Sequence, residues 1–305
     1  MRRIDALISH IREMDNPSAV GLDLRLDLIP DEIKKEAFER LGCGCEAVSE
    51  IFYYLNGKII DAVCGIVPAV KPQIAFYEMY GAPGIEAYVK TVAYAAKKGM
   101  TVIGDVKRSD VASTAEAYSN GHIGWVSING ESLSVFGEDF ITINPYLGGD
   151  SVAPFLINCE KYGTGLFILV KTSNPGSGQI QDLMTTDGCV HEIVGRLVSE
   201  WGAGLTGEYG YSSIGAVVGA THPKTAATLR GQMRYTFFLA PGYGAQGGGA
   251  KDAAACFDSS GGGAIVNSSR AIIGAWMESG VDFDIAARNA AVKMRDDIRS
   301  ALKNA

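Results

Sequence analysis

Residues 101–114 read TVIGDVKRSDVAST, and their first half shows the unit that decides the fold: an apolar, β-branched run that ends in polar side chains. The run TVIG is typical of a buried strand. It leads into Asp105, Lys107 and Asp110, three charges within six positions. Charges are costly to bury unless they are paired. Their place at the end of a buried strand therefore needs an explanation.

The same unit recurs along the chain. Eight apolar runs each end in a polar or Gly-rich turn, at residues 19–24, 65–73, 101–107, 139–145, 165–173, 214–223, 235–242 and 263–270. Runs that are apolar throughout are typical of parallel strands covered on both faces. Helical patterns lie between them, such as residues 85–99 and, after the last run, 284–304. Eight β-then-α units predict an α/β fold, a (β/α)8 TIM barrel forming one domain over residues 1–305, with an open doubly wound sheet as the alternative.

Composition is that of an enzyme-sized globule. The formal net charge of −7 over 305 residues argues against a nucleic-acid partner, which would favour a basic face. No apolar run of the sequence is long enough to span a membrane. Residues 1–16 predict an amphipathic N-terminal helix without the apolar centre of a signal peptide, so we expect a cytoplasmic protein. Only Cys43 and Cys45 of the six Cys lie close together, which favours reduced thiols over a zinc site.

In barrels of this type, catalytic side chains come from the carboxyl ends of the strands. Side chains two apart on a strand share a face, so Asp105 and Lys107 are expected to point together into the barrel mouth. Lys71 and Asp23 end neighbouring runs and would lie beside them. The other polar strand-end residues are Asn144, Thr172, Ser173, His222, Gln246 and Arg270. The sequence therefore predicts a cluster of alternating acids and bases at one mouth.

Each charge also has an ordinary structural interpretation. Asp110 precedes a predicted helix at residues 111–118 and could cap it. Asp23 fits an ordinary loop acid, and Lys107 could pair with Asp105 only to offset the cost of burial. For Asp23 or Asp110 alone, the ordinary interpretation is the better one. Four charges at one mouth are costly to desolvate and no fold needs them, so together they favour a functional site.

The Gly-rich segment 240–249, APGYGAQGGG, follows the seventh run. Three of its glycines match GxGxxG, but a dinucleotide fingerprint belongs in a chain's first βαβ unit, with an acid about 20 residues later. In barrels, the loops after strands seven and eight form the usual phosphate site. Gln246 and Arg270 lie in these loops and offer donors to a phosphate. A flexible turn with a solvated Arg is the alternative.

Taken together, these segments resemble the orotidine 5′-phosphate decarboxylase family, in its longer bacterial branch. The most specific motif is DVKRSDVAST, with GLDLR and KPQIAFYE before it and KTSNPG, APGYGAQGG and NSSRAI after it. The resemblance covers all eight strand ends, from residue 19 to 274. It implies a (β/α)8 barrel that works as a homodimer without metal or organic cofactor. It also implies conversion of orotidine 5′-monophosphate to UMP and CO2, the last step of de novo pyrimidine synthesis.

The resemblance implies roles for particular residues. The family's Lys-Asp-Lys-Asp array falls on Lys71, Asp105, Lys107 and Asp110, with Lys107 stabilising and protonating the carbanion at C6. Asp110 and Thr114 would come from the partner subunit. The family's substrate contacts fall on Asp23, Lys71 and Gln73 for the ribose, Ser173 for the pyrimidine amide, and Gln246 and Arg270 for the phosphate. His222 and Asn144 match no family role, and the loop at 174–182 differs between branches.

Three other functions fit parts of the pattern. The related ketohexulose-phosphate synthases and keto-gulonate-phosphate decarboxylases share the barrel and a similar DxKxxD array. They hold Mg²⁺ with additional acids, whereas the fourth run here ends in Asn144 and Pro145. A non-catalytic barrel that senses UMP would not need two lysines and three acids. A scaffold that binds partners on its helical ring has no supporting feature in the sequence.

Overall fold

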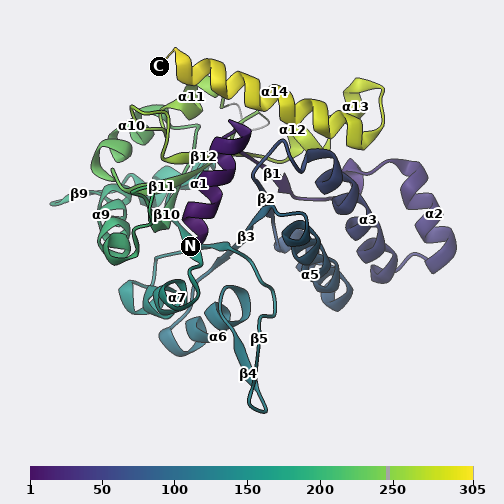
Figure 1. Ribbon diagram of the computed structural model, residues 1–305, viewed down its shortest axis with the longest axis horizontal. Coiled ribbons are helices and arrows are strands. Elements are labelled where there is room, and N and C mark those ends of the chain that lie inside the picture. Colours follow the sequence, from purple (N-terminus) through teal and green to yellow (C-terminus); the bar gives the residue numbers. More distant parts are fainter. Residues whose placement is uncertain (245–247, 305) are drawn as a thin grey trace.

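The chain forms a closed barrel of eight parallel strands, which confirms the predicted fold and excludes the open sheet (Figure 1). The computed structural model describes residues 1–244 and 248–304. Around the barrel the strand order is β1-β12-β11-β10-β7-β6-β3-β2. The strands are β1 (Ser18–Leu22), β2 (Ala69–Pro72), β3 (Thr101–Arg108), β6 (Phe140–Ile143), β7 (Gly165–Lys171), β10 (Ser212–Val218), β11 (Thr236–Pro241) and β12 (Ala264–Ser268). Each of them falls within or beside one of the apolar runs.

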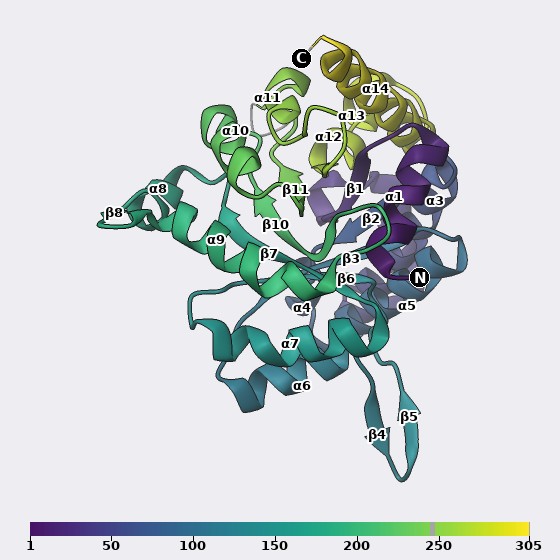
Figure 2. The ribbon, with the colours of Figure 1, turned by 60° about the vertical axis from the view of Figure 1, so that its left-hand side comes forward.

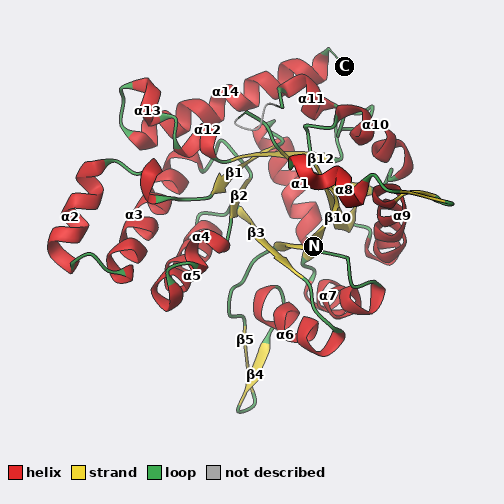
Figure 3. Cartoon of the chain, turned by 180° about the vertical axis from the view of Figure 1, so that it is seen from behind, coloured by secondary structure: helices red, strands yellow, loops and turns green. Residues whose placement is uncertain are grey.

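Helices surround the strands as an outer layer (Figure 3). The longer ones are α2 (Asp31–Leu41), α3 (Cys45–Val63), α5 (Gly81–Lys97), α6 (Ala112–His122), α7 (Gly149–Tyr162), α9 (Val190–Gly202), α10 (Pro223–Gln232) and α14 (Phe283–Lys303). The short ones are α4 (Ala75–Glu78), α8 (Gly178–Gln181), α11 (Ala250–Ala254), α12 (Arg270–Ile273) and α13 (Trp276–Ser279), with 3₁₀ turns η1 (Leu26–Leu28), η2 (Pro175–Ser177) and η3 (Ala203–Leu205). None of the described helices is both long and apolar enough to cross a membrane.

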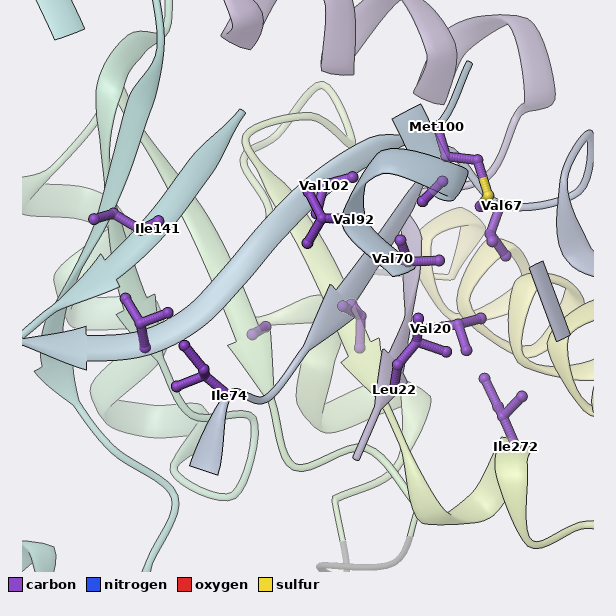
Figure 4. Packing of buried hydrophobic residues seen from close by; sticks show 14 of the residues in the cluster. Val20, Leu22, Val67, Val70, Ile74, Val92, Met100, Val102, Ile141 and Ile272 are labelled. Carbon is purple, nitrogen blue, oxygen red and sulfur yellow. The ribbon is translucent and has the colours of Figure 1, made fainter. Parts of the chain in front are cut away.

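The larger apolar cluster lies between the barrel and its helices. Figure 4 shows Val20, Val70 and Val102 on neighbouring strands, and they belong to one buried cluster with Val92 of α5 and Ile272 of α12. Burial of each such side chain contributes about 1.5–3 kcal/mol. The outward faces of the strands fill this cluster, and their inward faces fill a second one. The runs are therefore apolar on both faces.

Helix α1 (Arg3–Met14) closes the amino-terminal end of the barrel. Its apolar face, with Ile4, Leu7 and Ile8, joins a buried cluster with inward side chains such as Ile103 and Phe167. The predicted N-terminal amphipathic helix is thus confirmed. Because apolar side chains fill this end, the polar residues are left at the carboxyl ends of the strands.

Two hairpins outside the barrel were not expected. One, β4 (Val126–Ile128) with β5 (Glu131–Leu133), projects away from the barrel (Figure 2), and the other pairs β8 (Met184–Thr185) with β9 (Gly188–Cys189). Both residues of the first turn have positive φ, 50° at Asn129 and 85° at Gly130. Asn-Gly is a strong sequence signal for such a turn. The apolar-run criterion overlooks it because these strands are short and exposed.

Candidate active site

A cavity of about 490 Å³ opens at the carboxyl ends of the strands. Most of the residues predicted for the site line it: Asp23, Lys71, Gln73, Asp105, Lys107, Ser173 and Arg270. These residues come from segments that are up to 247 positions apart, and the barrel brings them to one mouth. The structure therefore brings these seven residues together at one mouth, and Asp23, Lys71, Asp105 and Lys107 lie among them.

Asp105 lies at the centre of the charged cluster. Its two carboxylate oxygens accept hydrogen bonds from different ammonium groups, Oδ2 from Lys71 Nζ at 2.6 Å and Oδ1 from Lys107 Nζ at 2.5 Å. The Thr142 hydroxyl donates a further hydrogen bond to Oδ1 at 2.9 Å. Asp105 and Lys71 are buried, whereas the Lys107 side chain is 45% exposed. Both lysines line the cavity, and of their two ammonium groups that of Lys107 is the more exposed to it.

The mutual arrangement of these charges keeps them ionised. Burial disfavours the Asp105 carboxylate, but the ammonium groups of Lys71 and Lys107 more than offset this and hold its pKa well below the ordinary value. Burial likewise opposes the charge of Lys71, yet the carboxylates of Asp105 and Asp23 raise its pKa above the ordinary value. Opposite charges at such distances favour the charged forms. Asp105 and Lys71 are thus both charged at neutral pH.

Lys107 departs from the regular strand geometry that the sequence suggested. Its φ is +45°, in the left-handed region that L-residues rarely adopt. The register with β6 shifts at this point. Thr142 Oγ1 accepts hydrogen bonds from the N–H groups of Val106 (3.0 Å) and Lys107 (2.9 Å). The side chain meets Asp105 as expected, but a bulge in β3 held by Thr142, rather than simple strand alternation, brings it there.

An acidic residue, Asp23, and an uncharged one, Gln73, lie beside the array. Asp23 Oδ1 is buried and has no hydrogen-bond partner within residues 1–244 and 248–304. Gln73 Oε1 accepts a hydrogen bond from the Ala75 N–H at 3.2 Å, which leaves its amino group toward the cavity that it lines. A buried acceptor without a partner costs free energy. A ligand with hydroxyl groups would satisfy Asp23.

Arg270 marks another side of the cavity. It is the first residue of α12, directly after β12, and its side chain is exposed. Gly242 and Tyr243 of the loop after β11 line the same region. Gly242 has a φ of 104°, which favours glycine at this position. Gln246, which was predicted to act with Arg270, lies outside the described residues.

Asp110 and Thr114 do not line the cavity of their own chain. Thr114 is exposed on α6, and Asp110 lies just before this helix. The helix begins after Val111, and Asp110 Oδ1 accepts a hydrogen bond from the Val111 N–H at 2.8 Å. The ordinary interpretation would require Asp110 to cap α6, and it does not, because Val111 holds that position.

Sequence reasoning missed several polar residues of the mouth. Thr142, Asn267 and Gln181 all line the cavity. Thr142 stands two positions after the inward-facing Phe140, so strand alternation was the signal that could have found it. Asn144, which was given no role, is not among the lining residues, and its side chain accepts a hydrogen bond from the Tyr146 N–H. None of the described residues form a group of three or more His, Cys, Asp or Glu that could hold a metal ion.

The closed barrel and the charged cavity at its carboxyl ends define a (β/α)8-barrel enzyme. A sequence model of the family described as orotidine 5′-phosphate decarboxylase / HUMPS matches residues 56–278. The orotidine 5′-phosphate decarboxylase of Caldicellulosiruptor bescii is 40% identical over 299 residues, covering 98% of both chains. That of Clostridium perfringens is 42% identical over 293 residues, covering 95% of this chain and 96% of the relative.

Solved structures agree with the sequence matches. The structure of Leishmania donovani OMP decarboxylase is similar with a TM-score of 0.76 and 26% identity, over 99% of this chain and 100% of that chain. The chain belongs to the orotidine 5′-phosphate decarboxylase family. This confirms the resemblance that its strand-end motifs indicated.

Proposed function

We propose that the protein converts orotidine 5′-monophosphate to UMP and CO2, the last step of de novo pyrimidine synthesis. The observation that carries the proposal is the hydrogen-bonded Lys71–Asp105–Lys107 array in the cavity of a chain that belongs to this family. The names of the relatives at about 40% identity over nearly the full length support the same reaction.

The chemistry needs such an array. Loss of CO2 from C6 leaves an electron pair in an sp² orbital with no carbonyl positioned to delocalise it. A fixed ammonium group beside C6, that of Lys107, stabilises the developing carbanion electrostatically. The same group then donates a proton to C6 as general acid. Its partial exposure to the cavity leaves it accessible to the substrate.

Asp105 has two roles in this proposal. Its carboxylate stays ionised, because the two ammonium groups hold its pKa low, and it fixes Lys107 in place. It also lies where the carboxylate of the substrate would be repelled, which raises the energy of the bound ground state. Relief of that repulsion accompanies departure of CO2.

The remaining residues bind the rest of the nucleotide. The unpartnered carboxylate oxygen of Asp23 accepts a hydrogen bond from a ribose hydroxyl. The amino group of Gln73 donates a hydrogen bond to a ribose hydroxyl. Arg270 and Gln246 bind the phosphate, and Ser173 contacts the pyrimidine amide. Binding energy from the phosphate and ribose then helps to close the site around the base.

We infer further that the enzyme is a cytoplasmic homodimer in which Asp110 and Thr114 complete the site of the other subunit. Their positions support this, because both lie outside the cavity of their own chain and Thr114 is exposed on α6. A two-fold axis near α6 would carry the same pair into each partner.

One assay tests the reaction and its nearest rival together. The purified protein is expected to deplete the absorbance of orotidine 5′-monophosphate equally well with and without EDTA. Activity that EDTA abolishes and Mg²⁺ restores would instead assign the protein to the Mg²⁺-dependent sugar-phosphate branch of the family.

Two variants separate chemistry from binding. Lys107→Ala should abolish turnover while UMP still binds, since the ribose and phosphate contacts remain. Arg270→Ala should mainly raise KM, because loss of a charged partner costs about 2–5 kcal/mol. An Arg270→Ala variant that loses kcat at unchanged KM would contradict the phosphate assignment.

A further inference from the structure

The segment between β7 and α9, residues 172–189, forms a wall of the cavity. Thr172, Asn174 and Gln181 line it together with Ser173. The proposed function assigns a contact to Ser173 alone. The other three side chains are joined by hydrogen bonds whose directions can be determined.

The direction follows from the backbone. The Thr172 N–H can only donate, and it donates to Gln181 Oε1 at 3.0 Å. This fixes the orientation of the Gln181 amide, so Nε2 donates to Thr172 Oγ1 at 2.8 Å. The Thr172 hydroxyl in turn donates its one proton to Asn174 Oδ1 at 2.7 Å. The chain of hydrogen bonds therefore runs in one direction, from Gln181 through Thr172 to Asn174.

This network leaves a hydrogen-bond donor of Gln181 available to a ligand. Gln181 Nε2 carries two protons, and Thr172 accepts one of them. Among the described residues no other atom accepts from Nε2, whereas Gln181 Oε1 is turned to the backbone. The polar edge that Gln181 offers to a ligand in the cavity is thus an N–H group.

Ionic contacts hold Gln181 in this position. The carboxylate of the next residue, Asp182, is paired with the buried ammonium group of Lys171 at 2.6 Å. His191 Nδ1, on α9, lies 2.7 Å from the Gln181 carbonyl oxygen and 3.2 Å from Asp182 Oδ1. The hydrogen bond from Lys171 also lowers the pKa of Asp182, so this carboxylate is ionised at neutral pH. Lys171, Asp182 and His191 thereby fix the end of α8.

The barrel order determines which edge of the base reaches this wall. Strand β7 lies four strands from β1 in either direction, so the two stand opposite each other across the mouth. The ribose residue Asp23 follows β1, and Arg270 follows the adjacent strand β12. A pyrimidine attached to a ribose at that side presents its far edge, position 4 of the ring, to the β7 wall.

We propose that Gln181 is a specificity-determining residue that donates a hydrogen bond to the carbonyl oxygen at position 4 of the pyrimidine. The inference rests on the proposed function, because it takes the position of the ribose from it. A 4-amino group at the same place would bring two donors together and leave both unpaired. Sites built to bond one such group reject analogues that lack it. The wall therefore selects UMP-type ligands over CMP.

Calorimetric titration of UMP, CMP and ribose 5-phosphate tests this on the whole protein. Gln181→Ala is expected to weaken UMP binding about fivefold to tenfold, the effect of one neutral hydrogen bond. Binding of ribose 5-phosphate should change less than about twofold, within the range of an uninvolved surface group. Binding of CMP should not weaken and should tighten to the extent that its 4-amino group no longer meets a second donor. Gln179→Ala is the matched control, because Gln179 is exposed on the same short helix and does not line the cavity. Its three affinities should equal those of the wild type.

Gln181→Glu provides a second variant. Its carboxylate keeps an acceptor for the Thr172 N–H but has no proton for the ligand, so the UMP preference should fall in the same way. An unchanged ratio of UMP to CMP affinity in both variants overturns the inference, as does an equal loss for UMP and ribose 5-phosphate. Turnover of orotidine 5′-monophosphate by the wild type is measured separately. If turnover is present while the ratio stays unchanged, the inference fails and the proposed function stands.

Discussion

The Thr142 hydroxyl offers the sharpest test of how the site is held together. It is 1% exposed and joins three groups: it donates to Asp105 Oδ1 and accepts from the backbone N–H groups of Val106 and Lys107. Thr142→Val keeps the shape of the side chain and removes all three hydrogen bonds. Thr142→Ser keeps the hydroxyl and removes only a methyl group, which makes it the matched control.

The expected magnitude follows from these contacts. A hydrogen bond to a charged group contributes about 1.5–3 kcal/mol, and a buried N–H without a partner costs about 1–3 kcal/mol. The Val106 N–H is in a buried residue, whereas Lys107 is exposed and its N–H can bond to water. The lost hydrogen bond to Asp105 and the unpartnered N–H of Val106 together should lower the free energy of unfolding of Thr142→Val by about 3–5 kcal/mol. Thr142→Ser should cost about 1 kcal/mol, as for one buried methyl group.

Catalysis should fall for a separate reason. The left-handed backbone at Lys107 costs about 1–2 kcal/mol and needs its surroundings to hold it. Without the hydroxyl, Lys107 can relax to an ordinary conformation that moves its ammonium group, and a displacement of about 1 Å can reduce the rate about 100-fold. Urea unfolding and steady-state kinetics measure the two effects. A Thr142→Val enzyme with the stability and kcat of Thr142→Ser would refute this reasoning.

Three further predictions follow from the charges. Lys107→Ala and Asp110→Asn, each inactive alone, should regain about a quarter of wild-type sites when co-expressed, since half of the dimers are mixed and carry one intact site; persistent inactivity of proven mixed dimers would exclude the shared site. The pKa of Asp105 is lowered and that of Lys71 is raised. The difference in free energy of unfolding between wild type and Lys71→Met, the stability gap, should therefore be constant from about pH 5 to 9. In urea unfolding this gap should shrink as the pH falls below about 4, where Asp105 begins to lose its contribution, and as it rises above about 10.4 through the folded pKa of Lys71. Asp182→Asn should lower the free energy of unfolding by about 1–2 kcal/mol, less than for a fully buried pair because Asp182 is 50% exposed.

The barrel was predictable because its signal is local and repeated. Each strand is buried on both faces and therefore leaves an uninterrupted apolar run, and the polar residue after the run marks the mouth. The hairpin at residues 126–133 left no such run, since its strands are exposed and its only signal is the Asn-Gly turn. Prediction from burial works where burial decides the structure.

The charged residues of the site could be found for the same reason, since a charge at the end of an apolar strand is conspicuous. Thr142 could not be found in this way, because a threonine in the strand Phe140–Ile143 is ordinary in β structure. The orientation of Gln181 depends on how the segment after β7 folds back on Thr172, nine residues earlier. No pattern in the sequence predicts that this segment folds back on Thr172.

The apolar floor beneath the array explains why two lysines and an aspartate can be held so closely. Below Asp105, the barrel interior is filled by Ile103, Phe140 and Phe167, and α1 closes the end. Within residues 1–244 and 248–304, this apolar floor covers one side of the charges, and the exposed side chain of Lys107 lies on the cavity side. In such surroundings charges interact more strongly than in water. Asp105 stays ionised, Lys71 stays paired, and Lys107 is the most exposed of the three charged side chains. The helix that seals the far end of the barrel thus contributes to the electrostatics of the proposed reaction without contacting the substrate.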